Sequence, residues 1–299
     1  MQSLHMLRTG LAAAAILGGS AASAVAQQPA QPLAVTQLKA NTYWTQGGAG
    51  GNTGIIIGTT GVIVVDAKTT TDSAKEMLAA IAKLTPKPIT HVILTHSDGD
   101  HVNGLAAFPT GLTIIAHEGN KKEMDTALAA GGRGAPPADH LPTQVITRNS
   151  ETLTIDGVKV TLLHWAPAHT SGDLIVYLPD QKIVFTGDII SGALTADPNI
   201  HLEKSGTAAG WITTAKGIAA LDADQFVPGH GNLQAKADIQ ARVASVEGKR
   251  AKIAAMIKEG KSLADIKTAL GVAPPPAAAA GGRGPAPTFI DIVYGELKK

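Results

Sequence analysis

The sequence contains no cysteine and few aromatic residues, and both absences narrow what the protein can be. Without thiolates, any metal must be held by nitrogen and oxygen ligands, which excludes thiolate zinc sites and iron–sulfur clusters. A chain exported to an oxidising compartment can still fold without disulfides if its core is large enough. Because aromatic residues make up only 3% of the chain, the core must be aliphatic, and platforms that stack single-stranded nucleic acid are not expected.

The sequence also lacks an excess of charge of either sign. It has 25 basic residues (Lys and Arg) and 24 acidic residues (Asp and Glu). This balance gives no electrostatic footprint for nucleic acid or for anionic membranes. We therefore expect a small-molecule substrate and no nucleic acid as partner, and the sequence does not indicate an oligomeric state.

The apolar run near the N-terminus, Leu11–Leu17, is too short to span a membrane as a stable helix. Arg8 precedes this run, and a small-x-small triplet ending at Ala26 follows it. This pattern is typical of a secretory signal peptide rather than of a structured helix. We expect residues 1–26 to be removed and residues 27–34 to form a tether. The mature protein would then be periplasmic or secreted, without a membrane anchor.

Strand signals and helical patterns alternate along the rest of the chain. An amphipathic helix begins near Asp72, whose side chain is a potential N-cap. A hairpin is expected around Asp156-Gly157, because apolar residues alternate on either side of this turn signal. The remaining strands are expected at 35–38, 42–45, 54–57, 62–65, 89–94, 114–116, 174–178, 183–185 and 226–227. Helices are expected at 72–84, 119–130, 208–221, 235–258, 262–270 and 289–297.

These elements come in two rounds, each β-rich at first and then helical. Such an order favours an α/β fold: a four-layer αβ/βα sandwich of two mixed β-sheets flanked by helices. Residues 35–260 are expected to form this domain, and residues 261–299 a C-terminal helical extension with a Pro/Ala/Gly-rich insert. The similar low-complexity stretches 131–137 and 274–287 are interpreted as flexible surface insertions.

One segment carries four potential metal ligands directly after an apolar, strand-like run: His96, Asp98, Asp100 and His101. Residues two apart in an extended chain point to the same side, so that His96 and Asp98 are expected to reach one metal ion. A sharp turn at Gly99 would let Asp100 and His101 face a second ion, roughly 3.5–4 Å from the first.

Three further candidate ligands follow strand-like stretches: His169, Asp188 and His230. The alternative is that all these residues only form turns, in which Asp, Gly and Ser are common. Burying three carboxylates together is very unfavourable, however, unless cations compensate their charge. The seven residues therefore predict a site for two metal ions.

The order of these residues resembles the metallo-β-lactamase superfamily. The family pattern runs His-x-His-x-Asp-His, then a lone His, a Gly-Asp and a late Gly-His, and the match extends from Asn52 to Gly231. The resemblance implies a division of the ligands between two ions: His96 and His169 with the first, Asp100, His101 and His230 with the second, and Asp188 between them. It also implies that Asp66, at the end of an expected strand, supports the site.

One position departs from the family pattern, because Asp98 stands where the second histidine is expected. An aspartate can bind zinc, but it adds negative charge and would lower the Lewis acidity of the ions. The flavin-linked diiron branch of the family carries a glutamate at this place. The resemblance thus implies two divalent ions as cofactors, with zinc as the first choice and iron or manganese as alternatives.

The activity that the resemblance implies is that of an exported metal-dependent hydrolase. A hydroxide held by both ions would attack an ester, lactone, thioester or related bond, and Asp100 or Asp188 would orient it or accept its proton. β-Lactam cleavage ranks lower, because the family's β-lactamases generally carry cysteine or serine at the position of Asp188. A diiron redox protein on the same ligands and a non-catalytic metal-binding protein are further alternatives.

His201 lies in the loop 197–206, which we expect to cross the mouth of the site with the insertion 131–140. There it would contact substrate or metal. Asp173 and Thr170 are expected to hydrogen-bond the ligand histidines. Four other histidines are not assigned to the site: we expect structural roles for His91 and His164, and surface positions for His117 and His140.

Overall fold

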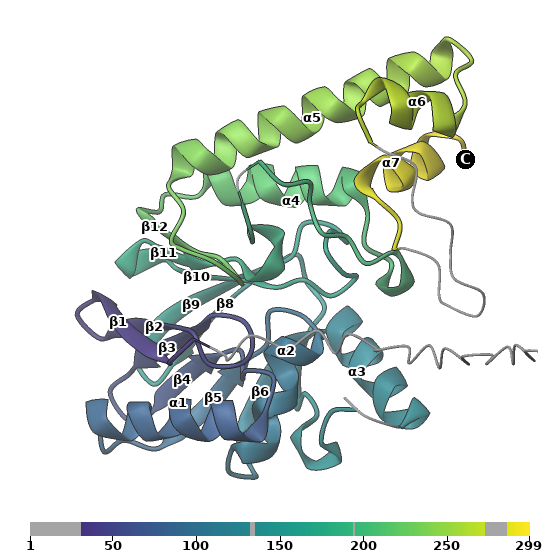
Figure 1. Cartoon of the computed structure of the whole chain (residues 1–299). Helices are drawn as coiled ribbons and strands as arrows, with labels where there is room; N and C mark the ends of the chain where they lie inside the picture. The colour runs from purple at the N-terminus through teal and green to yellow at the C-terminus, as the bar shows by residue number, and fades with distance from the viewer. Residues whose placement is uncertain (1–30, 132–134, 194, 273–285) are drawn as a thin grey trace, which may run out of the picture.

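Figure 1 shows the computed structural model of the chain, which describes residues 31–131, 135–193, 195–272 and 286–299. The predicted signal peptide and residues 27–30 of the predicted tether lie outside the described residues. So do parts of both low-complexity insertions, at 132–134 and 274–285. In the part of the chain that the structure describes, no helix has the length and apolar character needed to cross a bilayer.

Two mixed β-sheets form the centre of the fold. The first sheet contains seven strands in chain order: β1 (Ala34–Lys39), β2 (Thr42–Gln46), β3 (Thr53–Ile57), β4 (Val62–Val65), β5 (Ile89–Ile93), β6 (Thr113–His117) and β7 (Gln144–Ile146). Strands β1 to β4 are antiparallel neighbours, whereas β4 to β7 run parallel to one another. The strand β7 was not predicted.

The second sheet contains five strands in the order β12-β11-β10-β9-β8. Their bounds are β8 (Ser150–Ile155), β9 (Val158–Leu163), β10 (Ile175–Leu178), β11 (Ile183–Phe185) and β12 (Gln225–Val227). The hairpin of β8 and β9 turns at Asp156-Gly157, as predicted, and both turn residues have a positive φ. Strands β11 and β12 are parallel, and the other pairs are antiparallel.

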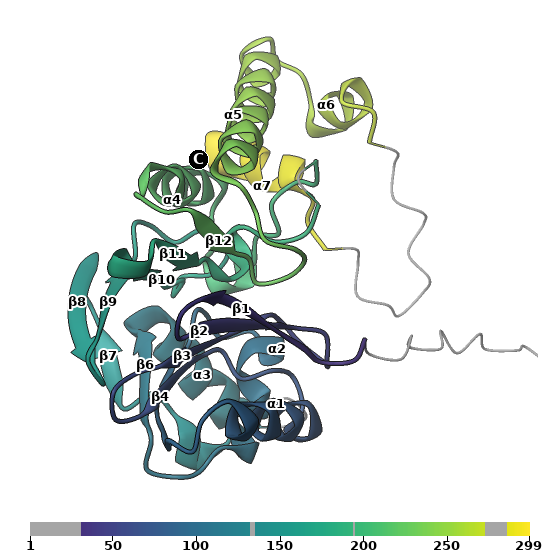
Figure 2. The ribbon, with the colours of Figure 1, turned by 90° about the vertical axis from the view of Figure 1, so that its left-hand side faces the viewer.

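Helices cover the outer face of each sheet (Figures 1 and 2). The first sheet is covered by α1 (Thr71–Leu84) and α3 (Glu118–Ala130). The second is covered by α4 (Ala208–Ala220), α5 (Lys236–Lys258) and α7 (Phe289–Leu297), with the short α6 (Leu263–Ala269) beside α7. One aliphatic cluster fills the space between the sheets, and one lies under the helices on either side. The predicted four-layer αβ/βα sandwich is therefore confirmed.

Helix α1 illustrates how the local sequence sets an element. Its N-cap is Thr70 and not Asp72 as predicted: Thr70 Oγ1 accepts a hydrogen bond from the Ser73 amide at 3.1 Å. Asp72 lies in the first turn, where a negative charge favours the helix dipole. Met77 is buried on the face toward the sheet, whereas Leu84, expected on the same face, is 37% exposed.

The C-terminal helices belong to the same packing as the second sheet. Thr288 caps α7 and forms a capping box with Asp291. Phe289 and Val293 are buried in the cluster that also contains Trp211 of α4. The described end of the chain, residues 286–299, therefore packs on the domain and not apart from it.

The pairing of the strands brings four strand ends to one edge of the sandwich. The parallel pair of β4 and β5 aligns Val65 with Ile93, and the parallel pair of β11 and β12 aligns Phe185 with Val227. Hydrogen bonds across this edge join the two halves: the Asn52 amide donates to Gly229 O, and the Leu174 amide donates to Thr95 O, both at 2.7 Å. Side chains that follow these strands must meet at this edge.

Candidate metal centre

All seven predicted ligands lie together at this edge. They form three overlapping groups in which the potential ligand atoms are within 4.8 Å of one another: His96, Asp98 and His169; His96, His101 and Asp188; and Asp100, His101 and His230. Asp188 Oδ1 lies 3.5 Å from His101 Nε2 and 3.6 Å from His230 Nε2. Asp188 thus shares a group with His96 and His101 and also lies close to His230.

The ligand segment is not the extended loop and glycine turn that we expected after Asp98. Residues Gly99–Val102 form a short helix, α2, and the amides of His101 and Val102 donate to Asp98 O at 2.9 and 3.2 Å. The extended part before α2 does put His96 and Asp98 on one side, with His96 Nε2 3.7 Å from Asp98 Oδ2. The helical turn then directs Asp100 toward His230, whose Nε2 lies 2.9 Å from Asp100 Oδ2.

Neighbouring groups orient the imidazole rings by their Nδ1 atoms. The ring of His101 contacts Asp66 Oδ2 through Nδ1 at 2.8 Å, and the ring of His169 contacts Asn199 O at 2.9 Å. His96 Nδ1 contacts Thr95 Oγ1 at 2.9 Å, and that hydroxyl in turn donates to Asp66 Oδ2. With Nδ1 held by these groups, Nε2 is the nitrogen of each ring that faces the centre, as in ligand histidines.

Asp66 holds this arrangement at some conformational cost. It is buried, and its carboxylate accepts hydrogen bonds from the amide and the hydroxyl of Thr95 at 2.8 Å each, besides its contact with His101. Its φ is +63°, which is uncommon outside glycine. A buried residue in this conformation is typical of functional sites. Asp66 thus has the supporting position that the resemblance implied.

Two glycines allow the strand ends to approach. A Cβ at Gly229 would lie 1.9 Å from Asp188 Oδ1, so that a larger residue would push this carboxylate away. Gly187 has a φ of +51°, and a Cβ there would lie 2.8 Å from Thr95. Close contacts therefore explain why glycine precedes Asp188 and His230 in the sequence.

The donor set fits metal ions by an observation independent of the resemblance. His96 Nε2 and Asp188 Oδ1 are buried side-chain atoms without a hydrogen-bond partner in the part of the chain that the structure describes. Buried polar atoms are normally bonded, because leaving them unpaired is costly. Cations between the clusters would satisfy both atoms. Imidazole and carboxylate donors without thiolate suit zinc, iron and manganese.

The ionisation of the side chains agrees with this fit. Burial would raise the pKa of Asp188, but the imidazoles of His101, His96 and His230 close to its carboxylate hold that pKa well below its usual value. Burial lowers the pKa of His96 well below its usual value, so that this ring is neutral, the form that binds metal. Burial also opposes the protonation of His169, yet the hydrogen bond with Asp98 raises its pKa to about 9. Metal binding at His169 must therefore release a proton.

Some predicted neighbours lie elsewhere. Asp173 and Thr170 do not bond the ligand rings as expected; instead the Asp173 carboxylate accepts hydrogen bonds from the Thr170 amide and hydroxyl and orders the turn that carries His169. His117 and His140, expected on the surface, are only 6% and 3% exposed. They fill internal positions: His117 caps α3 through Gly119 N and stacks on His164, while His140 contacts Phe108 O. His164 is buried, as expected.

Lys204 and Lys68 are residues of the site that sequence reasoning missed. The ammonium group of Lys204 donates to Asp98 Oδ1, and to Ser97 Oγ at 2.9 Å. Lys68 is fully buried and donates to the carbonyls of Gly47 and Gly51 at 2.9 and 2.8 Å, which holds the glycine-rich loop against the centre. Burial lowers the pKa of Lys68 to about 8. For Lys68 the sequence offered one signal, its position two residues after the strand-end Asp66. For Lys204 the sequence offered no signal.

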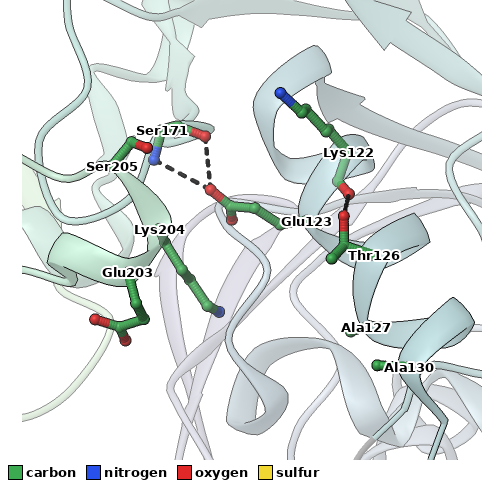
Figure 3. A pocket seen from close by; sticks show the side chains of 9 residues that line it. All are labelled: Lys122, Glu123, Thr126, Ala127, Ala130, Ser171, Glu203, Lys204 and Ser205. Atoms are coloured by element: carbon green, nitrogen blue, oxygen red, sulfur yellow. Dashed lines mark hydrogen bonds between the residues drawn. The ribbon is translucent and has the colours of Figure 1, made fainter.

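A cavity of about 400 Å³ adjoins the centre on the side of Lys204 (Figure 3). Its lining comes from α3, from the turn after His169 and from the loop 197–206, which was expected to shape the substrate pocket: Lys122, Glu123, Thr126, Ala127, Ala130, Ser171, Glu203, Lys204 and Ser205. The Glu123 carboxylate accepts from the amide and hydroxyl of Ser171, as the dashed lines in Figure 3 show, and from Ser97. None of the seven candidate ligands lines the cavity; Lys204, which donates to Asp98, connects it to the centre.

Comparisons with known proteins agree with this geometry. The chain is 26% identical over 212 residues to a linear primary-alkylsulfatase of a Pseudomonas species, a match that covers 57% of this chain and 39% of that protein. It is 27% identical over 202 residues to the alpha subunit of the 2,4-dinitroanisole O-demethylase of a Nocardioides species, which covers 67% of this chain and 58% of that subunit. The chain thus spans less than two thirds of the length of these relatives.

Solved structures share the fold. The stereoselective inverting sec-alkylsulfatase Pisa1 from Pseudomonas sp. superposes with a TM-score of 0.66 at 18% identity, over 81% of this chain and 46% of that one. A metallo-beta-lactamase from Pontibacter korlensis gives 0.60 at 19% identity, over 72% of this chain and 99% of that one. The family model described as the metallo-beta-lactamase superfamily matches residues 47–230, which include all seven candidate ligands. The chain belongs to the metallo-beta-lactamase superfamily.

Proposed function

We propose that this protein is an exported hydrolase that uses two divalent metal ions, in the first place zinc, to cleave an ester, lactone, thioester or related bond. The observation that carries the proposal is the pair of buried, unpartnered atoms, His96 Nε2 and Asp188 Oδ1, inside an assembly of seven nitrogen and oxygen donors. Family membership and the relatives named above support an enzyme of the metallo-hydrolase type. Export is supported by the signal-like segment that ends at Ala26.

When bound, two divalent ions would supply Lewis acidity and lower the pKa of a water molecule. The side chains of the chain provide the rest. Asp188 and Asp100 both have a pKa below the usual value, against the effect of burial, so that they are ionised at neutral pH and can accept a proton or a hydrogen bond from the attacking water. Asp100 is 38% exposed, while Asp188 is 9% exposed, so that Asp100 is the more accessible of the two.

The cavity offers a substrate both charged and apolar surface, because two lysines and two glutamates line it together with alanine side chains of α3. The relatives named as alkylsulfatases add sulfate esters to the esters, lactones and thioesters that we propose. β-Lactams remain the lower-ranked substrates.

A substrate panel with matched variants tests this proposal. The purified protein, stripped with a chelator and reloaded with zinc, is assayed on sulfate esters, carboxylic esters, lactones, thioesters and β-lactams. We expect His101→Ala and His230→Ala to reduce kcat/KM by more than about 100-fold, since losing a ligand costs more than losing an outer partner. His91→Ala, a half-buried histidine outside the centre, is the control. Hydrolysis that persists in both ligand variants would contradict the mechanism.

A further inference from the structure

We propose that His201 supplies a third imidazole nitrogen to the first metal position, beside His96 and His169, while Lys204 engages the oxygen of Asp98 that faces away from that position. The inference rests on the proposed metal centre, but it concerns a ligand that neither the motif nor the family pattern assigns. It makes the loop 197–206 part of the centre and not only part of the substrate pocket.

The surroundings of one oxygen atom carry the inference. Asp98 Oδ2 lies 3.1 Å from His169 Nε2, 3.3 Å from His201 Nε2 and 3.7 Å from His96 Nε2. Three imidazole nitrogens thus converge on the same carboxylate oxygen. The rings of His169 and His201 meet edge to face, with centroids 4.7 Å apart, as do the rings of His96 and His169 at 4.8 Å. The ligand atoms of His96, Asp98 and His169 all lie within 4.8 Å of one another. His201 Nε2 reaches this group through Asp98 Oδ2 and would bring a third nitrogen ligand to a cation held there.

His201 is oriented in the same way as the predicted ligands. Its Nδ1 contacts Glu203 Oε1 at 2.5 Å, which leaves Nε2 as the nitrogen that faces Asp98. A carboxylate on the far nitrogen is the partner that metal-bound histidines commonly have, and Asp66 has this position behind His101.

Backbone hydrogen bonds hold the segment of His201 against the segment of His169. The His201 amide donates to His169 O at 2.8 Å, and the carbonyl of His201 accepts from the amides of Lys204 and Gly206 at 3.0 and 2.9 Å. A Cβ at Gly206 would lie 2.3 Å from His169 O, so that the two segments are in close contact. The loop therefore delivers His201 at a defined distance from His169.

Lys204 explains how Asp98 can act as a ligand through one oxygen. Its ammonium group donates to Asp98 Oδ1 and to Ser97 Oγ, which leaves Oδ2 for the cation. The lysine also offsets one of the three carboxylate charges of the centre, and thereby limits the loss of Lewis acidity that an aspartate ligand would bring. Lys204 is a positioning residue in this account, since it acts through Asp98.

Metal binding, measured apart from turnover, tests the inference. Cobalt(II) and zinc are titrated into chelator-treated wild type, His201→Ala, Lys204→Met and the control His91→Ala, with a competing chelator to give each dissociation constant. We expect wild type and His91→Ala to bind two ions, and His201→Ala to bind one of them at least about 100-fold more weakly. The visible absorption of the cobalt(II) protein should change in His201→Ala, because one nitrogen ligand is lost at that position. Lys204→Met should weaken the same ion.

Glu203→Gln provides a second variant in case His201→Ala does not fold, which circular dichroism would reveal. It retains the ring of His201 and removes the carboxylate behind it, so that we expect a 10- to 100-fold weaker ion, in the range known for such outer partners. Unchanged affinities and an unchanged cobalt spectrum in the folded His201 and Glu203 variants, with only KM altered, would overturn the inference and make His201 a substrate contact. A wild type that binds no metal would refute the proposed function itself.

Discussion

Replacing Asp66 with asparagine is the sharpest test of how the centre is held. The substitution keeps the size of the side chain and suits the positive φ, since asparagine adopts this conformation more readily than most residues. The amide oxygen can still accept from the Thr95 backbone, as Oδ1 does now at 2.8 Å. The amide NH₂ would, however, face the Thr95 hydroxyl and the His101 Nδ1–H, two donors that the carboxylate now accepts from.

The magnitude follows from these two lost hydrogen bonds. A hydrogen bond to a charged group contributes about 1.5–3 kcal/mol, and the buried donors left unpaired add to the loss. Because the two bonds share one acceptor, their contributions are not additive. We expect Asp66→Asn to lower the free energy of unfolding of the chelator-treated protein by about 3 kcal/mol. It should weaken the ion at His101 by 10- to 100-fold, because the tautomer that exposes Nε2 is no longer favoured.

The assay is urea unfolding together with zinc titration against a competing chelator. Asp156→Asn is the matched control, because Asp156 also has a positive φ, of +49°, and also accepts two hydroxyl hydrogen bonds, from Thr60 and Thr90, but lies on the β8–β9 turn outside the centre. This control should lose stability without losing zinc affinity. If Asp66→Asn kept the zinc affinity of wild type within about 3-fold, the account of ring orientation would be refuted.

Three further predictions concern the loop over the centre, acid stability and metal removal. Gly51→Ala would put a Cβ 2.3 Å from the His101 ring, so that we expect the second ion to bind at least about 10-fold more weakly, measured by the same titration; an unchanged affinity would mean that the loop moves freely. Burial and the stacked His164 lower the pKa of His117 to about 4, so that its neutral form stabilises the fold above pH 6.5 and this contribution is lost as the pH falls toward 4. The variant His117→Asn can still cap α3. It should reduce the loss of unfolding free energy between pH 7 and pH 4 by on the order of 2 kcal/mol, measured by urea unfolding in the presence of chelator. Identical pH profiles of wild type and variant would contradict this prediction. The Tm of wild type should rise with the concentration of added zinc and should be lowest in the presence of chelator. A Tm that does not change with zinc concentration would contradict binding to the native state.

Much of the fold could be predicted because its signals are local. The hairpin at Asp156-Gly157 has turn chemistry and alternation together, and it forms as predicted. The cap of α1 was misassigned to Asp72, because two neighbouring residues, Thr70 and Asp72, both have side chains that can cap a helix and only the backbone conformation selects between them. The helical conformation of Gly99–Val102 was not foreseen, because four residues are too few for a periodic pattern.

The candidate centre could be predicted in its members but not in its surroundings. Each candidate ligand follows a short apolar, strand-like run, and this pattern is visible in the sequence. The pairs that complete the site join distant segments: Lys204 contacts Asp98, and Lys68 contacts the carbonyl of Gly51. His117 was expected on the surface, yet it is buried and stacks on His164. Contacts of this kind depend on how the two sheets pack, which no local pattern encodes.

The metal content of the purified protein tests the central claim most directly. Mass spectrometry after extensive dialysis without chelator should find about two zinc ions per chain, because the centre has donors for two clusters around Asp188. His101→Ala, which removes a ring that contacts Asp188, should lower this content. One or two irons per chain, or almost no metal in the folded wild type, would contradict the zinc hydrolase and favour redox chemistry or a binding role for the same residues.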